Sequence, residues 1–268
     1  MLPQAKNQSL LYVSDLGANA VDVYPYPSGK LVGSLHGFGS VAGLCVDKAG
    51  DVFVVDEAGP VQVFAHGGTS PIRELTTSGA PYGCAVDPAG GNLAVTNLSS
   101  VLYGTVAIYT KAKGSAKEYL DDKVDATFFC GYDGSGNLFA DGWDRYGNPI
   151  LLKLPKGSKT FRPFKLNASD TNPGGVQWDG KYVAVGNRGG GVIYRTSATT
   201  GKTVQTITLK DGANVEQFWI AGSTVIGPNA QSGGTVNYWH YPAGGSATKT
   251  ISGFSYPFGA TVSPATKR

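Results

Sequence analysis

Three cysteines and three histidines are the residues of this sequence that could most readily act as nucleophiles or metal ligands. The cysteines, Cys45, Cys84 and Cys130, form no CxxC pair, which argues against a zinc site or a thioredoxin-like redox centre. Each cysteine lies in an apolar segment. We therefore expect three buried thiols that take no part in chemistry.

The histidines offer no better case for catalysis. His36, His66 and His240 fall near predicted outer strands or turns, so they are not expected to converge on a zinc or lyase centre. The sequence contains no GxSxG motif. The Gly-rich segment 187–191 precedes a strand rather than a helix and lacks the helix N-terminus that binds phosphate, so we interpret it as a tight turn.

Composition excludes several other functions. The 22 Lys and Arg residues nearly balance 19 Asp and Glu residues, and the lysines are scattered, so nucleic acid is not an expected partner. No apolar run approaches the ~18 residues of a membrane-spanning helix. Residues 1–5 do not resemble a signal peptide, whereas the low charge content and abundant Ser and Thr favour an exported protein. The compartment stays open.

A repeated pattern organises the chain and must position any site. An apolar segment, an Asp, a short Gly turn and a β-branched or aromatic run recur in VDKAGDVFVV, VDPAGGNLAV, YDGSGNLFA and WDGKYVAV, with a degenerate copy in WIAGSTVI. The Asp-equivalent positions are 47, 87, 133, 179 and 221. Spacings of about 40–46 residues are typical of the four-stranded blades of a β-propeller.

The two ends of the chain complete this pattern. Residues 256–263 match the segment before the turn, and residues 9–15 match the segment after it. We therefore predict an all-β, single-domain, six-bladed propeller whose C-terminal strand, about 256–263, joins the N-terminal blade and closes the ring. The predicted repeats span about 9–50, 51–91, 92–136, 137–180, 181–222 and 223–268. In the second blade, strands are expected at 41–47, 51–56, 60–65 and 71–76.

The segment from Pro81 to Val95, followed by VAIY at 106–109, resembles an NHL-type repeat. Weaker matches occur at 51–64 and 11–24. The resemblance implies a six-bladed propeller but no single activity, since similar propellers include interaction and sensor domains, gluconolactonase-like metal hydrolases, strictosidine-synthase-like enzymes and a peptide-amidating lyase.

The gluconolactonase resemblance implies a place for one divalent cation, near the start of the inner strands. The ligands carried over to this sequence would be Glu216, Asn172 and Asn214, with Asp125 or Asp170 as a fourth. Turn residues with satisfied hydrogen bonds are the competing interpretation of the same side chains.

Aromatic and charged residues suggest a recognition surface at the same channel mouth. The candidate ligand-binding residues are Tyr82, Phe128, Trp143, Asp144, Arg145, Arg188 and Phe258. The inserted loop Trp143–Asn148 is the strongest of these candidates, because an exposed Trp and Arg need a reason.

We therefore expect a monomeric, non-catalytic binding module without a cofactor. Its partner would be a protein, peptide, glycan or small molecule at the channel mouth. The alternative is a metal-dependent hydrolase, lactonase or lyase with Ca²⁺ or another divalent cation in the channel, and the residues leave catalysis open.

Overall fold

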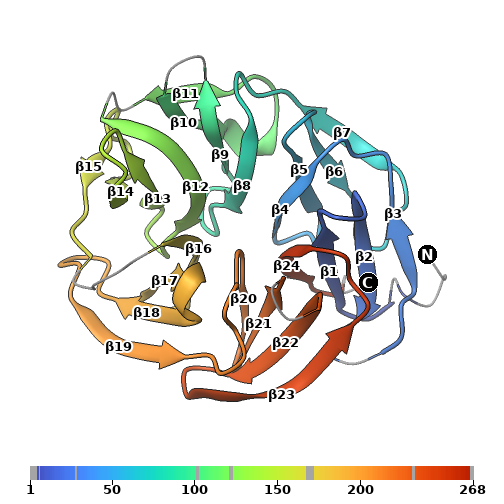
Figure 1. Cartoon of the computed structure of the whole chain (residues 1–268). Coiled ribbons are helices and arrows are strands. Elements are labelled where there is room, and N and C mark those ends of the chain that lie inside the picture. The colour runs from blue at the N-terminus through green and yellow to red at the C-terminus, as the bar shows by residue number, and fades with distance from the viewer. Residues whose placement is uncertain are drawn as a thin grey trace.

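The computed structural model describes residues 5, 7–27, 29–100, 103–120, 123–166, 172–230 and 233–265. Their strands form six four-stranded antiparallel sheets arranged as blades around a central channel (Figure 1). The predicted six-bladed β-propeller is thus confirmed. None of the helices in these segments is long and apolar enough to cross a membrane.

The blades are named here from the inner strand outward. Blade 1 consists of β24 (Pro257–Ser263), β1 (Leu10–Asp15), β2 (Ala20–Pro25) and β3 (Gly33–Leu35); blade 2 of β4 (Val41–Val46), β5 (Val52–Asp56), β6 (Val61–Phe64) and β7 (Pro71–Leu75); and blade 3 of β8 (Pro81–Val86), β9 (Leu93–Ser100), β10 (Tyr103–Tyr109) and β11 (Lys117–Leu120). Blade 4 consists of β12 (Val124–Tyr132), β13 (Leu138–Asp144), β14 (Pro149–Leu154) and β15 (Arg162–Pro163); blade 5 of β16 (Pro173–Trp178), β17 (Val183–Asn187), β18 (Val192–Thr196) and β19 (Thr203–Thr208); and blade 6 of β20 (Trp219–Ala221), β21 (Thr224–Asn229), β22 (Thr235–His240) and β23 (Gly244–Ser252).

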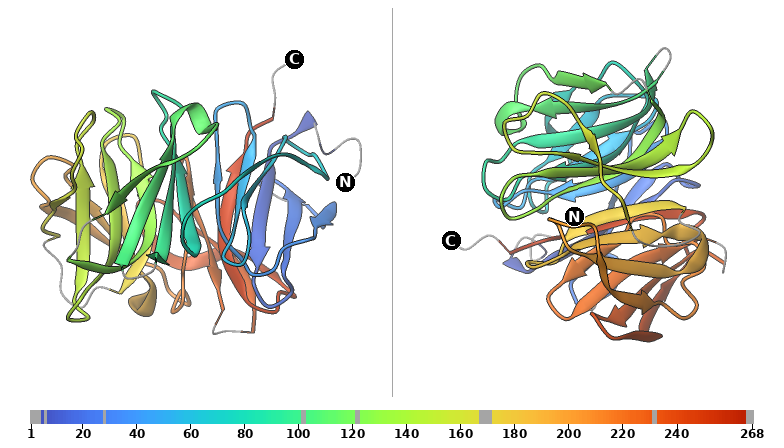
Figure 2. Two further views of the ribbon diagram at one scale, coloured as in Figure 1. Left: turned by 90° about the horizontal axis from the view of Figure 1, so that it is seen from above. Right: turned by 90° about the vertical axis from the view of Figure 1, so that its left-hand side faces the viewer.

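The ring has two faces, visible at the upper and lower edges of the left-hand view in Figure 2. We call the face where inner strands begin and second strands end face A, and the face where inner strands end face B. The short 3-10 helices η2 (Thr110–Ala112) and η3 (Arg188–Gly190) interrupt the strand pattern. The predicted strands of blade 2 agree with β4–β7 to within about a residue at most ends.

The ring closes through its first and last strands, as predicted. The C-terminal strand β24 pairs with β1 from Leu10↔Ser263 to Asp15↔Pro257 and becomes the inner strand of blade 1. A hydrogen bond from blade 2 also holds this strand, since His66 Nδ1 lies 2.6 Å from Ser263 Oγ. The Ser263 hydroxyl donates to the carbonyl oxygen of Gly50 over 2.7 Å. Residues from opposite ends of the chain therefore share one sheet and bind the next blade.

The repeated Asp is a turn residue on face B. In four blades its Oδ1 accepts a hydrogen bond of 2.9 Å from the main-chain N–H two residues ahead, which fixes the turn between the inner and second strands. These residues are Asp47, Asp87, Asp133 and Asp179. The repeat that identifies the fold is therefore explained by turn geometry.

Glycine on the inner strands allows neighbouring blades to approach closely. A Cβ atom added to Gly83 would lie 2.5 Å from the carbonyl oxygen of Phe128 in the next blade. A Cβ atom added to Gly131 would lie 2.5 Å from the carbonyl oxygen of Val176. Any larger residue would push the inner strands apart.

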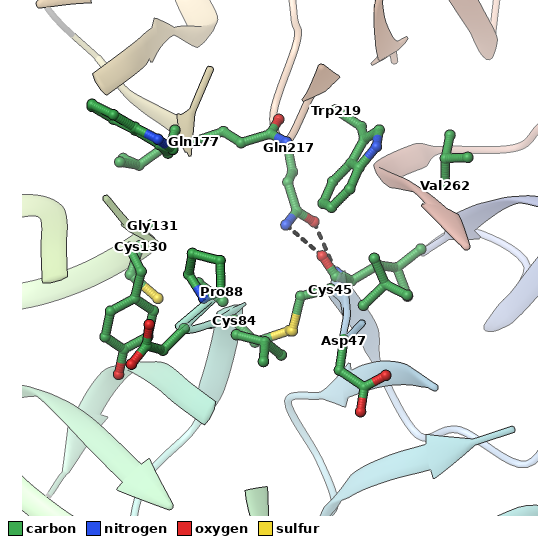
Figure 3. A pocket seen from close by; sticks show the side chains of 18 of the residues that line it. Cys45, Asp47, Cys84, Pro88, Cys130, Gly131, Gln177, Gln217, Trp219 and Val262 are labelled. Carbon is green, nitrogen blue, oxygen red and sulfur yellow. Dashed lines mark hydrogen bonds between the residues drawn. A yellow bond between two sulfur atoms is a disulfide. The ribbon is translucent and has the colours of Figure 1, made fainter. Parts of the chain in front are cut away.

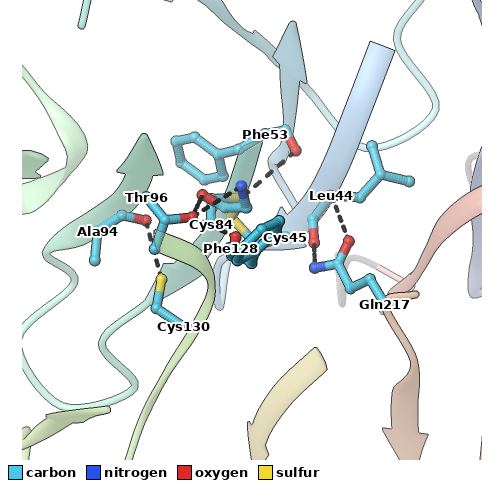
Figure 4. Close-up of a disulfide and its surroundings, with 10 residues drawn as sticks. Leu44, Cys45, Phe53, Cys84, Ala94, Thr96, Phe128, Cys130 and Gln217 are labelled. Carbon is cyan, nitrogen blue, oxygen red and sulfur yellow. Dashed lines mark hydrogen bonds between the residues drawn. A yellow bond between two sulfur atoms is a disulfide. The ribbon is translucent and has the colours of Figure 1, made fainter. Parts of the chain in front are cut away.

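The expectation of three free thiols is wrong for two of the cysteines. Cys45 on β4 and Cys84 on β8 form a disulfide between the inner strands of blades 2 and 3, with their Cα atoms 5.7 Å apart (Figure 4). Cys130 is free and buried, as expected, and its Sγ lies 3.8 Å from the carbonyl oxygen of Ala94. Burial raises the pKa of the Cys130 thiol far above its ordinary value, which disfavours the reactive thiolate form.

Strand periodicity explains which cysteines pair. Cys45 stands two residues before its repeat Asp, whereas Cys84 and Cys130 stand three residues before theirs. Successive strand residues point to opposite faces of a sheet, so Cys45 and Cys84 face each other across adjacent blades. The position that faces Cys130 in the same way is Ala85, which packs in the same cluster. Because Ala85 carries no thiol, Cys130 cannot form a disulfide there.

Candidate functional site

An aromatic cluster closes the channel near face A. The ring centroid of Tyr82 lies 5.3 Å from that of Phe128 and 5.0 Å from that of Phe258, with both pairs near perpendicular. Tyr82 and Phe258 belong to blades 3 and 1, which blade 2 separates, so their rings meet across the channel. The three side chains are only 9, 9 and 2% exposed. Three predicted ligand-binding residues thus come together, but as the floor of face A rather than as an exposed patch.

An ion pair covers part of this cluster. Arg188 Nη1 lies 3.0 Å from Glu216 Oε2, and its guanidinium carbon lies 5.3 Å from the centroid of the Phe128 ring. Burial raises the pKa of Glu216, and the neighbouring Arg188 opposes that shift. The Arg188 guanidinium stabilises the Glu216 carboxylate, and it is itself held in place by this ion pair and by its contact with the Phe128 ring.

Charge and exposure argue against the predicted cation site. The Glu216 carboxylate faces the positive charge of Arg188, which disfavours a cation there. Asn172 and Asp125 are exposed, Asn214 is half-buried, and Asp170 lies outside the described residues. Within the described segments, no group of three or more His, Cys, Asp and Glu residues could hold a metal ion. The fit is poor, and the cation site stays a prediction that melting with added calcium would test.

The predicted recognition loop forms the hairpin turn between β13 and β14. The ring centroid of Trp143 lies 6.4 Å from that of Phe128, edge to face, so the hairpin rests on the aromatic cluster. The Oδ1 of Asp144 accepts the main-chain N–H groups of Tyr146 and Asn148 at 2.8 Å each. Hydrogen bonds from Asn148 also lower the pKa of Asp144.

The tip of this hairpin is the most exposed aromatic position found. Tyr146 is 82% exposed, and Arg145 beside it is also exposed. Sequence reasoning singled out Trp143 and Arg145 but not Tyr146. Its place between the turn-forming residues Asp144 and Asn148 was the available signal, because the tip of a tight turn points to solvent.

Acidic and amide side chains at the ends of second strands have structural roles on face A. The carboxylate of Asp15 accepts the N–H groups of segment 255–256, and that of Asp56 accepts those of segment 39–40. The Oδ1 of Asn187 likewise accepts the N–H of residue 172. Each side chain holds the segment that leads into an inner strand, so these polar groups already have hydrogen-bond partners within the protein.

Two buried polar residues escaped the sequence reasoning. Asp141 on β13 accepts the main-chain N–H groups of Phe129 and Gly174 at 2.8 Å each, linking blades 4 and 5. Gln217 lies just before β20 and pairs with the main chain of Leu44, accepting its N–H at 2.8 Å and donating to its carbonyl oxygen at 2.7 Å. Neither residue belongs to the repeated motif, and only the packing of blades shows their partners.

We expect Asp141 to make the stability of the protein depend on pH. Burial raises the pKa of Asp141 from 3.8 to about 8, against the opposing effect of its N–H donors and of Arg188. The folded state then binds the proton of Asp141 more tightly than the unfolded state does. The contribution of Asp141 to the free energy of unfolding is therefore greatest at low pH and is lost as the pH rises towards 8. We expect this loss to be on the order of 3 kcal/mol between pH 5 and pH 8.

Urea unfolding of the wild type and of Asp141→Asn at pH 5, 6, 7 and 8 measures this effect. The difference in unfolding free energy between the two proteins should change in favour of the variant as the pH rises. Asp144→Asn is the control, since that exposed carboxyl group lies on the same strand and has a lowered pKa. A wild-type-to-Asp141→Asn difference that stays constant with pH would show that Asp141 is ionised throughout.

Comparisons with known proteins agree with this architecture. No protein-family model matches the chain, and no curated protein matches it. It is similar to a chain from a crystal structure of a nidogen/laminin complex, with a TM-score of 0.79, 14% identity, and coverage of 97% of this chain and 100% of that one. It is also similar to a protein of unknown function from Bacteroides caccae, with a TM-score of 0.73, 11% identity, and coverage of 95% and 98%. These likenesses establish the six-bladed β-propeller fold, while the NHL-type repeat stays a prediction.

Proposed function

We propose that this propeller is a binding module that recognises a protein or peptide partner on face A, with the hairpin Trp143–Asn148 as its anchor. The observation that carries the proposal is the 82% exposure of Tyr146 at the tip of this hairpin. Large exposed aromatic side chains next to arginine are typical of the residues that contribute most to protein interfaces.

The hairpin is well suited to present that side chain. Its turn is held by the hydrogen bonds to Asp144, and Trp143 anchors its base on Phe128. A rigid turn loses little conformational entropy when a partner binds, so more of the contact energy remains for affinity. The closed aromatic cluster beneath it makes this part of face A a surface rather than an open channel.

Two further observations agree with this proposal. The similar chain comes from a crystal structure of a nidogen/laminin complex, so a propeller of this shape occurs in a complex between proteins. The disulfide between Cys45 and Cys84 is typical of proteins in oxidising compartments, which supports an extracytoplasmic location.

Selection of binding peptides tests the proposal without a known partner. We expect a displayed library of random peptides to yield sequences that bind the wild-type protein, and Tyr146→Ala to weaken these peptides at least tenfold, or about 1.4 kcal/mol. Trp143→Ala should weaken them too, because the hairpin loses its support.

Ile72→Ala is the matched control, since Ile72 is a similarly exposed apolar residue, at 56%, on the outer strand β7. Peptides that bind Tyr146→Ala and Trp143→Ala as tightly as the wild type would place the interaction elsewhere and overturn the proposal.

A further inference from the structure

The channel contains a cavity of about 410 Å³ on face B, away from the recognition hairpin (Figure 3). Its wall includes the Cys45–Cys84 disulfide and the last residues of the inner strands. We call it the face-B cavity. Cavities of this size typically hold small organic ligands.

The repeat itself supplies much of the apolar lining. In blades 2 to 5 the residue directly before the repeat Asp lines the face-B cavity, and in blade 1 the residue before Ser263 does so. These five residues are Val46, Val86, Tyr132, Trp178 and Val262. Blade 6 contributes Trp219, which starts β20, together with the two residues before it. Trp219 and the five residues named above, except Tyr132, are only half-buried, so their apolar atoms contact water unless a ligand covers them.

The inner end of the face-B cavity is closed. Gln217 reaches from blade 6 to Leu44 in blade 2 and passes the inner strand of blade 1 at Gly259, where an added Cβ would lie 2.5 Å from its Oε1 (Figure 3). The aromatic cluster of Tyr82 and Phe258 spans the channel near face A. The face-B cavity is therefore a blind pocket, which can enclose a ligand on several sides.

The side-chain amide groups that line the face-B cavity have hydrogen-bond partners within the protein. Both amide atoms of Gln217 bond to the main chain of Leu44. The Oε1 of Gln177 accepts the N–H of Ile220 at 2.7 Å, and its Nε2 donates to the carbonyl oxygen of the same residue at 3.4 Å. A polar ligand would find these amide groups already occupied and would meet the Tyr132 hydroxyl, which has no hydrogen-bond partner among the described residues, whereas an apolar ring would contact valine, indole and sulfur atoms.

We infer that the face-B cavity binds one uncharged, ring-containing apolar molecule of about two or three rings. The ring system lies among Trp178, Trp219 and the valines at the strand ends. This site is separate from the proposed protein-binding surface, because it opens on the opposite face of the ring.

Binding of N-phenyl-1-naphthylamine, an uncharged aromatic fluorophore, tests the inference. We expect saturable binding of one molecule per chain, with increased probe fluorescence. Val86→Arg, which places a charge among the lining residues, and Trp219→Ala, which removes an aromatic wall, should each raise the Kd at least tenfold.

Two variants serve as controls for this measurement. Ile72→Arg adds the same charge at an exposed position on β7, and Tyr146→Ala removes the proposed protein-binding anchor; both should leave the Kd unchanged. Unchanged probe binding in the folded Trp219→Ala protein, or several probes per chain, would overturn the inference. So would binding of maltotriose in place of the fluorophore, because it would show that the site takes a polar ligand.

Discussion

Replacing Cys45 and Cys84 together with alanine is expected to lower the free energy of unfolding by about 4 kcal/mol, because the disulfide closes a chain segment with a sequence separation of 39 residues. Without that link, the unfolded chain gains conformational freedom. The inner strands β4 and β8 also lose their covalent connection where they border the face-B cavity.

Chemical denaturation with and without a thiol reductant measures this contribution. The reductant should destabilise the wild type to nearly the level of the double variant and should leave the double variant itself unchanged. Cys130→Ala is the matched control, since Cys130 is buried at the corresponding depth but unpaired. Equal stability of the wild type with and without reductant, once the thiols are shown to be free, would contradict the expected role of the disulfide.

Removal of residues 257–268 is expected to abolish cooperative folding. The truncated chain lacks β24, so blade 1 loses its inner strand and β1 keeps only β2 as a partner. Buried Phe258 and Ala260 leave the core, and Ser263 can no longer bond to His66. An open ring exposes the edge of β1 to pairing with other chains, which favours aggregation.

Near-ultraviolet circular dichroism and thermal melting report on this change. We expect the truncated protein to lose its fixed aromatic signal and its sharp melting transition. A synthetic peptide of residues 255–265 should restore both, because β24 can pair with β1 from a separate chain. Ser263→Ala is the milder comparison and should melt cooperatively at a lower temperature. A truncated chain that melts as sharply as the full chain would show that ring closure is not required for folding.

The fold was predictable because its signals are local. The turn at each repeat Asp depends on residues within four positions, and a short apolar run such as 52–55 is visible within a single blade. Ring closure was also predictable, because residues 256–263 supply the half of the repeat before the turn and residues 9–15 supply the half after it.

The candidate site was predictable only in part. Placing aromatic residues at the starts of inner strands correctly brought Tyr82, Phe128 and Phe258 to one end of the channel. Their burial depends on how far each ring reaches across the channel, which no single repeat specifies. The pairing of Arg188 with Glu216 joins residues 28 positions apart in different blades, so local spacing could not show it.

The sequence by itself determined the number of blades, the turns between their strands and the apolar position before each repeat Asp. The tertiary structure decided which side chains meet between blades: Cys45 with Cys84, Gln217 with Leu44, and Asp141 with Phe129 and Gly174. The physical reason is that turns and strands depend on neighbouring residues, whereas contacts between blades depend on strand parity and on closing the ring. Those two properties belong to the assembled molecule, and they also create the face-B cavity.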